Sequence, residues 1–286
     1  MIKERLNPLN DFAFQKALGE KGDEEQLLAF LNAVLRRTGK DCLESVEILE
    51  GKDLPAEMIR GKASKLDVVA RLADKTKVNI EVQLENLYNM EKRSLDYWAG
   101  QYIKGIEKGQ DYVELPPVIA INILGFEYIP LDDFHTSFHI YEDRHKDYQL
   151  TDALELHFLD MIKFRRSKDK DIVNEPLHRW LVYFDDKSPQ NLVEEVIKMD
   201  PAIQKVQTTM ETIQRDEALY RTYLSYEKAE RDELNRINGA KRETDQRRTK
   251  EIAKKALAEG ASEEFVSKIT GLDMDTVKRL KPDIKG

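Results

Sequence analysis

The stretch KLDVVARLADKTKVNIEVQLEN, residues 65–86, is typical of two strands joined by the polar turn ADKTK. Side chains alternate between the two faces of a strand, which places Asp67 beside apolar neighbours on the first strand. On the second strand Glu81 and Gln83 share one face, and the Val and Ile residues that alternate with them share the other. The stretch therefore predicts a hairpin whose two strands carry carboxylates among apolar positions.

Segments with helical or alternating periodicity surround this hairpin and extend the expected order of elements. The segment at 116–126 contains a continuous apolar run, which is typical of a strand buried on both faces of a sheet. The order helix, strand, strand, strand, helix, strand predicts an α/β core. Two later alternating segments, 135–142 and 154–161, are expected to extend the sheet at an edge. The core elements are expected at 23–39, 45–51, 65–86, 89–109 and 116–126.

The sequence pattern becomes helical beyond residue 171, and the charged stretch 201–258 is expected to form exposed helix. Within it, residues 225–251 contain very few apolar side chains, so a solvated helix, a partner-dependent coiled coil and a flexible link all fit. The expected divisions of the chain are a core at 1–165, a helical region at 166–250 and a small helical module at 251–286.

The last segment has the proportions of a helix-turn-helix. Gly260 and Gly271 are expected to end helices, and Ser262 and Asp273 are expected to cap the helices that follow. The alternative is a helical hairpin that only packs.

Composition restricts the class of protein. The chain has 286 residues, a formal net charge of -8 and one cysteine, Cys42, so it has neither an internal disulfide nor a thiolate cluster for zinc. No apolar run approaches the roughly 20 residues that a membrane span requires, and the start MIKERLNPLND lacks the apolar centre of a secretory signal. The expected location is the cytoplasm, without a membrane partner.

Asp67, Glu81 and Gln83 are the candidate catalytic residues. Two carboxylates on paired strands can hold Mg²⁺ and leave coordination positions open for water and a phosphate. Gln83 shares the face of Glu81 and can contact the same water or phosphate oxygen. The alternative is a solvated strand face on a protein that binds without cutting.

The order of these motifs resembles the PD-(D/E)xK nuclease superfamily, in particular its transposase-like branch, the Rpn recombination-promoting nucleases. The resemblance covers residues 7–165 as one ordered series. It implies a restriction-endonuclease-like core, with a mixed central sheet flanked by helices, followed by an α-helical C-terminal region. The segments that carry it are NDFAFQKALG, LLAFLNAVL, KLDVVARLADKTKVNIEVQLEN, KRSLDYWAGQY, PPVIAINILGF and LELHFLDM.

The resemblance also implies a Mg²⁺-dependent DNA endonuclease, with Mn²⁺ as an alternative metal, acting in recombination or on mobile elements. Asp67 and Glu81 would be metal ligands, and Gln83 would stand where the superfamily usually has lysine. Lysine adds a positive charge, whereas a neutral amide only forms hydrogen bonds. A catalytically weak or inactive DNA-binding or assembly protein is therefore the alternative function.

Two further sets of residues are candidates for the site. Asp11 lies in a segment that matches the branch, as an additional acidic group or as the N-cap of a helix. Arg93, Tyr97, Gln101 and Lys104 recur at helical spacing and form a face expected to contact DNA. A solvated face with ordinary ion pairs is the alternative for these four residues.

Other chemistries have little support in the sequence. His135 and His139 are four residues apart, but they lie on an expected strand without a third ligand nearby. The chain has no G-x-S-x-G elbow and no glycine-rich phosphate loop. A phosphohydrolase for small substrates is a third alternative. A homodimer would suit cleavage of both DNA strands, because each active site hydrolyses one strand.

Overall fold

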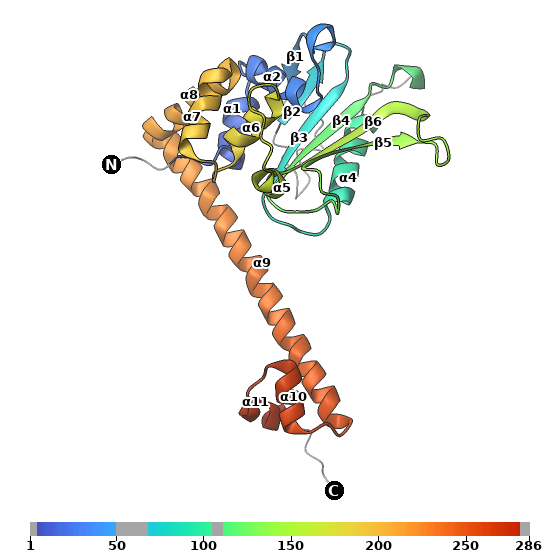
Figure 1. The fold of residues 1–286 in the computed structure, drawn as a ribbon, viewed down its shortest axis with the longest axis vertical. Helices are drawn as coiled ribbons and strands as arrows, with labels where there is room; N and C mark the ends of the chain where they lie inside the picture. Colours follow the sequence, from blue (N-terminus) through green and yellow to red (C-terminus); the bar gives the residue numbers. More distant parts are fainter. Residues whose placement is uncertain (1–4, 50–67, 105–110, 281–286) are drawn as a thin grey trace. The chain divides into compact units, whose positions relative to one another are not determined.

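The computed structural model describes residues 5–49, 68–104 and 111–280 (Figure 1). The chain divides into two compact units, Met1–Tyr226 and Glu227–Gly286. The division expected near residue 165 falls inside the first unit. No helix in the described part of the chain is long and apolar enough to cross a membrane.

A mixed six-stranded sheet forms the centre of the first unit, in the order β1-β2-β3-β4-β6-β5 (Figure 1). The first three strands pair antiparallel, β3, β4 and β6 pair parallel, and β5 closes the edge antiparallel to β6. This sheet confirms the α/β class, the hairpin and the expected extension of the sheet by two later strands, of which β6 is internal and β5 forms the edge. The strands are β1 (Val46–Ile48), β2 (Val68–Leu72), β3 (Lys77–Gln83), β4 (Val118–Leu124), β5 (His135–Tyr141) and β6 (Gln149–Asp160).

The turn between β2 and β3 follows directly from its polar residues. Lys75 has a φ of 73°, and its amide donates to the carbonyl of Leu72 at 3.0 Å. The Asp74 carboxylate accepts from the amide of Thr76 at 2.9 Å, as is usual for aspartate in turns. These contacts set the hairpin register, in which Val68 pairs with Ile80.

Helices cover the sheet on both faces. The larger core joins the Val and Ile side chains of β3 and β4 to apolar side chains of α1, α2, α5, α6, α7 and α8. On the other face α4 packs over a smaller apolar cluster that includes Met90, Ala120 and Phe158. β4 is buried along its whole length, which confirms the expectation from its continuous apolar run. The helices named here are α1 (Asp11–Leu18), α2 (Glu24–Val34), α4 (Met90–Ile103), α5 (Met161–Arg166), α6 (Pro176–Phe184), α7 (Gln190–Met199) and α8 (Pro201–Arg215), with short 3₁₀ helices η1 (Gly39–Asp41) and η3 (Tyr112–Glu114).

The charged stretch 201–258 is helical but, contrary to the expectation, only partly exposed. Its first part, α8, buries one apolar stripe against the large core, because the apolar residues recur at three- and four-residue spacing. Its second part is α9 (Glu217–Ala258), a continuous helix that includes residues 225–251. The buried residues of α8 are Ala202, Ile203, Val206, Met210 and Ile213.

The second unit ends in two short helices, α10 (Glu263–Thr270) and α11 (Met274–Leu280). Ala253, Val266 and Val277 form their small apolar core with the end of α9. The predicted caps are confirmed: the Ser262 hydroxyl accepts from the amide of Phe265 at 3.2 Å, and the Asp273 carboxylate accepts from the amide of Thr276 at 2.7 Å. Gly271 has a φ of 72°, the left-handed conformation that ends helices.

Candidate active site

The polar face of β3 supplies two of the predicted site residues. Alternation along the strand directs Val78 and its apolar partners to the large core, so Asn79, Glu81 and Gln83 face α4. β3 is an internal strand that pairs with both β2 and β4. Glu81 is consequently only 4% exposed, and Gln83 at the end of the strand is half-buried.

Arg93 on α4 connects these two side chains. Its Nη1 donates to Gln83 Oε1 at 2.7 Å, and its Nη2 forms a hydrogen-bonded ion pair with Glu81 Oε1. The same Nη2 donates to the hydroxyl of Tyr97, one helical turn further on, at 3.0 Å. The guanidinium also lies 5.6 Å from the centroid of the Tyr97 ring. One cation therefore holds the carboxylate and the amide that the sequence motif places two residues apart.

The contact with Arg93 decides how the Gln83 amide is oriented. A guanidinium carries only donors, so the atom of Gln83 that faces it must be the carbonyl oxygen. The amide NH₂ of Gln83 consequently points away from Arg93. In this orientation the NH₂ group of Gln83 can donate to a molecule beside β3.

Glu81 has an unusual electrostatic environment. Its Oε2 is buried and has no hydrogen-bond partner among the described residues. The pKa of Glu81 is raised to about 7: burial is the largest cause and the Asp11 carboxylate adds to it, whereas the Arg93 guanidinium and the Tyr97 hydroxyl act in the opposite direction. A buried carboxylate oxygen without a donor is a favourable position for a cation.

The structure places Asp11 close enough to act on Glu81, although it lies at the start of a different helix. It is the first residue of α1, and the N-cap of that helix is Asn10, whose side chain accepts from the amide of Ala13. The alternative interpretation of Asp11 as the N-cap is therefore wrong. Asp11 is exposed, and it adds negative charge near Glu81.

The α4 face expected to contact DNA lies against the sheet. Tyr97 and Gln101 are buried, which excludes the alternative of a solvated face for these two residues. Lys77 donates to the carbonyl of Gln101 at 3.0 Å, and Lys104 at the end of the helix is half-buried. A role of these residues in DNA contact stays a prediction, and in the structure Arg93 and Tyr97 contact each other beside Glu81.

Of the two predicted metal ligands, the structure describes Glu81 but not Asp67. Asp67 lies outside the described residues, so its relation to Glu81 is not part of the structure. Among the residues that are described, no group of three or more His, Cys, Asp or Glu side chains has the arrangement to hold a metal ion. Glu81 Oε2 nevertheless fits a divalent cation, because it is an oxygen of a carboxylate and accepts from no donor in the described part of the chain.

A buried polar chain beside Glu81 was not predicted from the sequence. The Ser94 hydroxyl of α4 donates to Asn122 Oδ1 at 2.7 Å, and Asn122 donates to the carbonyl of His157 at 3.0 Å. Asn122 is the register partner of Glu81 on β4. An asparagine within an otherwise apolar buried strand was the available signal, since such a group requires partners.

Gly125 allows β4 to end close to β3. Its amide donates to the carbonyl of Gln83 at 2.9 Å. A Cβ at this position would lie 2.9 Å from the backbone oxygen of Leu84, which is too close for any other residue without a shift. The glycine therefore helps to position the end of β3, where Gln83 lies.

The histidines on β5 and β6 form a separate hydrogen-bonded chain. His135 contacts His157 at 2.9 Å, and His157 contacts Glu155 at 2.7 Å. His139 lies 3.8 Å from the same carboxylate. Burial, followed by the effect of His157, lowers the pKa of His135 to about 3. His135 is thus a neutral, hydrogen-bonded histidine at ordinary pH.

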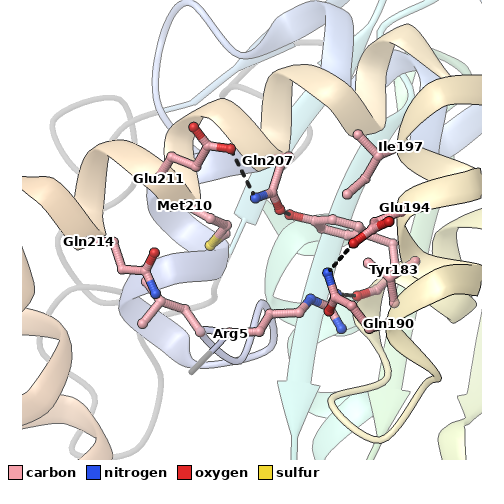
Figure 2. A pocket seen from close by; sticks show the side chains of 11 residues that line it. Arg5, Tyr183, Gln190, Glu194, Ile197, Gln207, Met210, Glu211 and Gln214 are labelled. Atoms are coloured by element: carbon pink, nitrogen blue, oxygen red, sulfur yellow. Dashed lines mark hydrogen bonds between the residues drawn. The ribbon is translucent and has the colours of Figure 1, made fainter. Parts of the chain in front are cut away.

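A cavity of about 460 Å³ lies between α6, α7, α8 and the N-terminal segment (Figure 2). It contains none of the predicted site residues. Arg5 donates to the backbone carbonyls of Tyr183 and Asp185, and the Tyr183 hydroxyl donates to Gln207 at 3.1 Å. Figure 2 also shows Gln207 donating to Glu211, at 3.3 Å. The Tyr183–Gln207 contact joins α6 to α8, and the Arg5 contacts join the N-terminal segment to the end of α6, which identifies a structural network.

Comparison with known proteins agrees with the fold. A family model described as PD-(D/E)XK nuclease family transposase matches residues 8–240. No curated protein and no solved structure matches the chain. The family match covers most of the chain, including the sheet, Glu81, Gln83 and Arg93, and it confirms the resemblance and the restriction-endonuclease-like fold expected from the sequence. The chain belongs to the PD-(D/E)XK nuclease family transposases.

Proposed function

We propose that the protein is a metal-dependent DNA endonuclease that hydrolyses phosphodiester bonds, with a role in recombination or mobile-element biology. The observation that carries this proposal is the state of Glu81: a buried carboxylate with one oxygen paired to Arg93 and the other without a partner among the described residues. The family to which the chain belongs supports nuclease activity and DNA as substrate.

In this proposal Asp67 and Glu81 hold Mg²⁺ or Mn²⁺. Asp67 lies outside the described residues, and in the sequence it directly precedes β2, the strand that pairs with β3. We expect Asp67 and Glu81 to supply the two carboxylates that such a site requires. When bound, the cation would lower the pKa of a water molecule and offset charge on the phosphate.

The protein groups then have separate tasks. Glu81 is kept in place by Arg93 through one oxygen, which leaves the other oxygen for the metal. Gln83 donates from its amide NH₂ to a phosphate oxygen or to the attacking water, because its carbonyl is engaged by Arg93. Asp11 adds negative charge that favours a cation close to Glu81.

The direct test is a plasmid-cleavage assay with Mg²⁺, with Mn²⁺ and with EDTA. We expect the wild-type protein to nick or linearise the plasmid with metal and to be inactive in EDTA. Asp67→Ala should abolish cleavage without lowering the melting temperature. Asp152→Ala is the matched control, since Asp152 is an exposed aspartate on β6 far along the sheet, and it should cut like the wild type. Cleavage that survives Asp67→Ala would contradict the proposed site.

The second candidate is an inactive protein of the same fold that binds DNA. The observation that favours it is the neutral Gln83 at the end of β3, since an amide contributes no positive charge. Such a protein would bind a DNA duplex equally well with and without EDTA and would not cut it with either metal. A gel-shift titration in both conditions separates the two functions.

A further inference from the structure

We propose that Arg93 and Gln83 act together as a subsite for a phosphate oxygen beside Glu81, in which Arg93 supplies the positive charge and Gln83 the hydrogen-bond donor. Arg93 is a positioning residue for Glu81 and Gln83 and the source of charge for the subsite. This inference rests on the proposed function and specifies how that site binds its substrate, a phosphodiester.

The chemistry of the site requires a cation at this place. Negative charge builds up on the phosphate oxygens during hydrolysis, and fixed positive charge and donors that face those oxygens stabilise it. Within the described residues, Arg93 is the cation that contacts both Glu81 and Gln83. Lys77, the nearest basic residue on β3, is directed to the carbonyl of Gln101.

Arg93 retains the capacity to bind an anion. A guanidinium has five N–H groups, and three of them are taken by Glu81, Gln83 and Tyr97. No other described residue accepts from the remaining two. The Arg93 side chain is 21% exposed, in contrast to 6% for the Glu81 side chain, so part of it is accessible to a ligand from solvent.

Gln83 is prepared as a donor by the same contact. Its carbonyl accepts from Arg93 at 2.7 Å, and a hydrogen bond to a charged donor polarises the amide so that its N–H groups donate more strongly. The pair therefore combines a charge and a donor, two properties that a single lysine side chain at position 83 would combine by itself.

If a lysine at position 83 can replace the Arg93–Gln83 pair, it should suppress the loss of Arg93, and this can be tested on the full-length protein. The variants are Arg93→Gln, Gln83→Leu and the double variant Gln83→Lys with Arg93→Gln, and the control is Lys92→Gln, which removes an exposed cation from the outer side of α4. Two quantities are measured: the affinity for a short fluorescein-labelled duplex in Ca²⁺ by anisotropy, and the cleavage rate in Mn²⁺.

We expect Arg93→Gln and Gln83→Leu to weaken duplex binding by about 10-fold and cleavage by about 100-fold. The double variant should regain most of both, because lysine returns the charge and the donor, and Lys92→Gln should match the wild type. Recovery in the double variant also shows that the protein can fold without Arg93.

Two results would overturn the inference: a double variant no better than Arg93→Gln, or a Gln83→Leu protein that binds the duplex like the wild type. If the wild type does not cut with either metal, the proposed endonuclease function fails, and the anisotropy measurements still decide whether the subsite exists.

Discussion

Two partly buried arginines, Arg5 at the α6–α8 cavity and Arg93 on α4, form networks of different kinds. Arg5 donates to the backbone carbonyls of Tyr183 and Asp185, and its guanidinium lies 5.0 Å from the centroid of the Tyr183 ring. Its hydrogen-bond acceptors are backbone carbonyls, which are neutral and do not titrate. The atom left over in this network is Arg5 Nε, a donor.

Arg93 instead holds a carboxylate and a side-chain amide. The atom left over is Glu81 Oε2, an acceptor that belongs to a buried acid. A spare acceptor with negative charge attracts cations, whereas a spare donor among backbone carbonyls does not. Both arginines are partly buried, so burial does not distinguish the two networks. The chemistry of the unsatisfied atom does: it is an acceptor in the candidate active site around Arg93 and a donor in the structural network around Arg5.

The largest effect is expected for Glu81→Gln. Glutamine keeps an oxygen that accepts from Arg93 but removes the charge that would hold a metal, so cleavage should fall by at least about 100-fold. The protein should stay folded, as judged by circular dichroism, because the contact with Arg93 survives. If Glu81→Gln retained metal-dependent cleavage, the Arg93 network would not contain a metal ligand and would not differ in function from the Arg5 network.

Arg5→Met is the corresponding test of the structural network around Arg5. It leaves two backbone carbonyls of the α6 end without their donor, so we expect the free energy of unfolding to fall by about 2 to 3 kcal/mol. The cleavage rate of the folded protein should not change. Urea titration and the plasmid assay measure the two quantities on the same preparation, and a selective loss of cleavage would show that the α6–α8 cavity serves function.

His135 differs from both arginines, because it is a partly buried polar group that is neutral at ordinary pH. Its pKa is lowered from 6.5 to about 3, so below pH 6.5 protons bind the unfolded chain and not the folded one. The stabilisation is therefore complete above pH 6.5 and decreases as the pH falls toward 3. At pH 5 the wild type should have lost about 2 kcal/mol relative to pH 7.5.

His135→Gln should largely abolish this pH dependence in urea titrations, because glutamine does not titrate and can still donate to His157. His145→Gln is the control, since His145 lies on the exposed loop between β5 and β6 and should leave the pH dependence as it is. A pH dependence that is equal in both variants would assign the effect to other groups.

The smallest effect is expected for Ser262→Ala, which removes a solvent-exposed N-cap instead of a buried network. The loss should be about 1 kcal/mol and confined to the second unit. Hydrogen exchange on the full chain should show faster exchange of the α10 amides, with no change in the β3 amides. Faster exchange in β3 would mean that this cap stabilises more than its own helix.

Local patterns in the sequence were sufficient for the elements. The alternation of β3, the apolar run of β4 and the caps at Ser262 and Asp273 depend on neighbours within a few residues, so periodicity and turn chemistry reveal them. The same alternation placed Glu81 and Gln83 on one face. The apolar stripe of α8 was also present in the sequence, but the surrounding charged residues concealed it.

By itself, the amino-acid sequence determined the α/β class, the hairpin and the placement of Glu81 and Gln83 on one strand face, because these follow from local periodicity, turn residues and the order of the elements. Only the tertiary structure decided that Arg93 engages both of them and that Glu81 keeps a buried oxygen without a partner among the described residues. Helical spacing shows which residues of α4 share a face, but packing of α4 on the sheet decides what that face contacts.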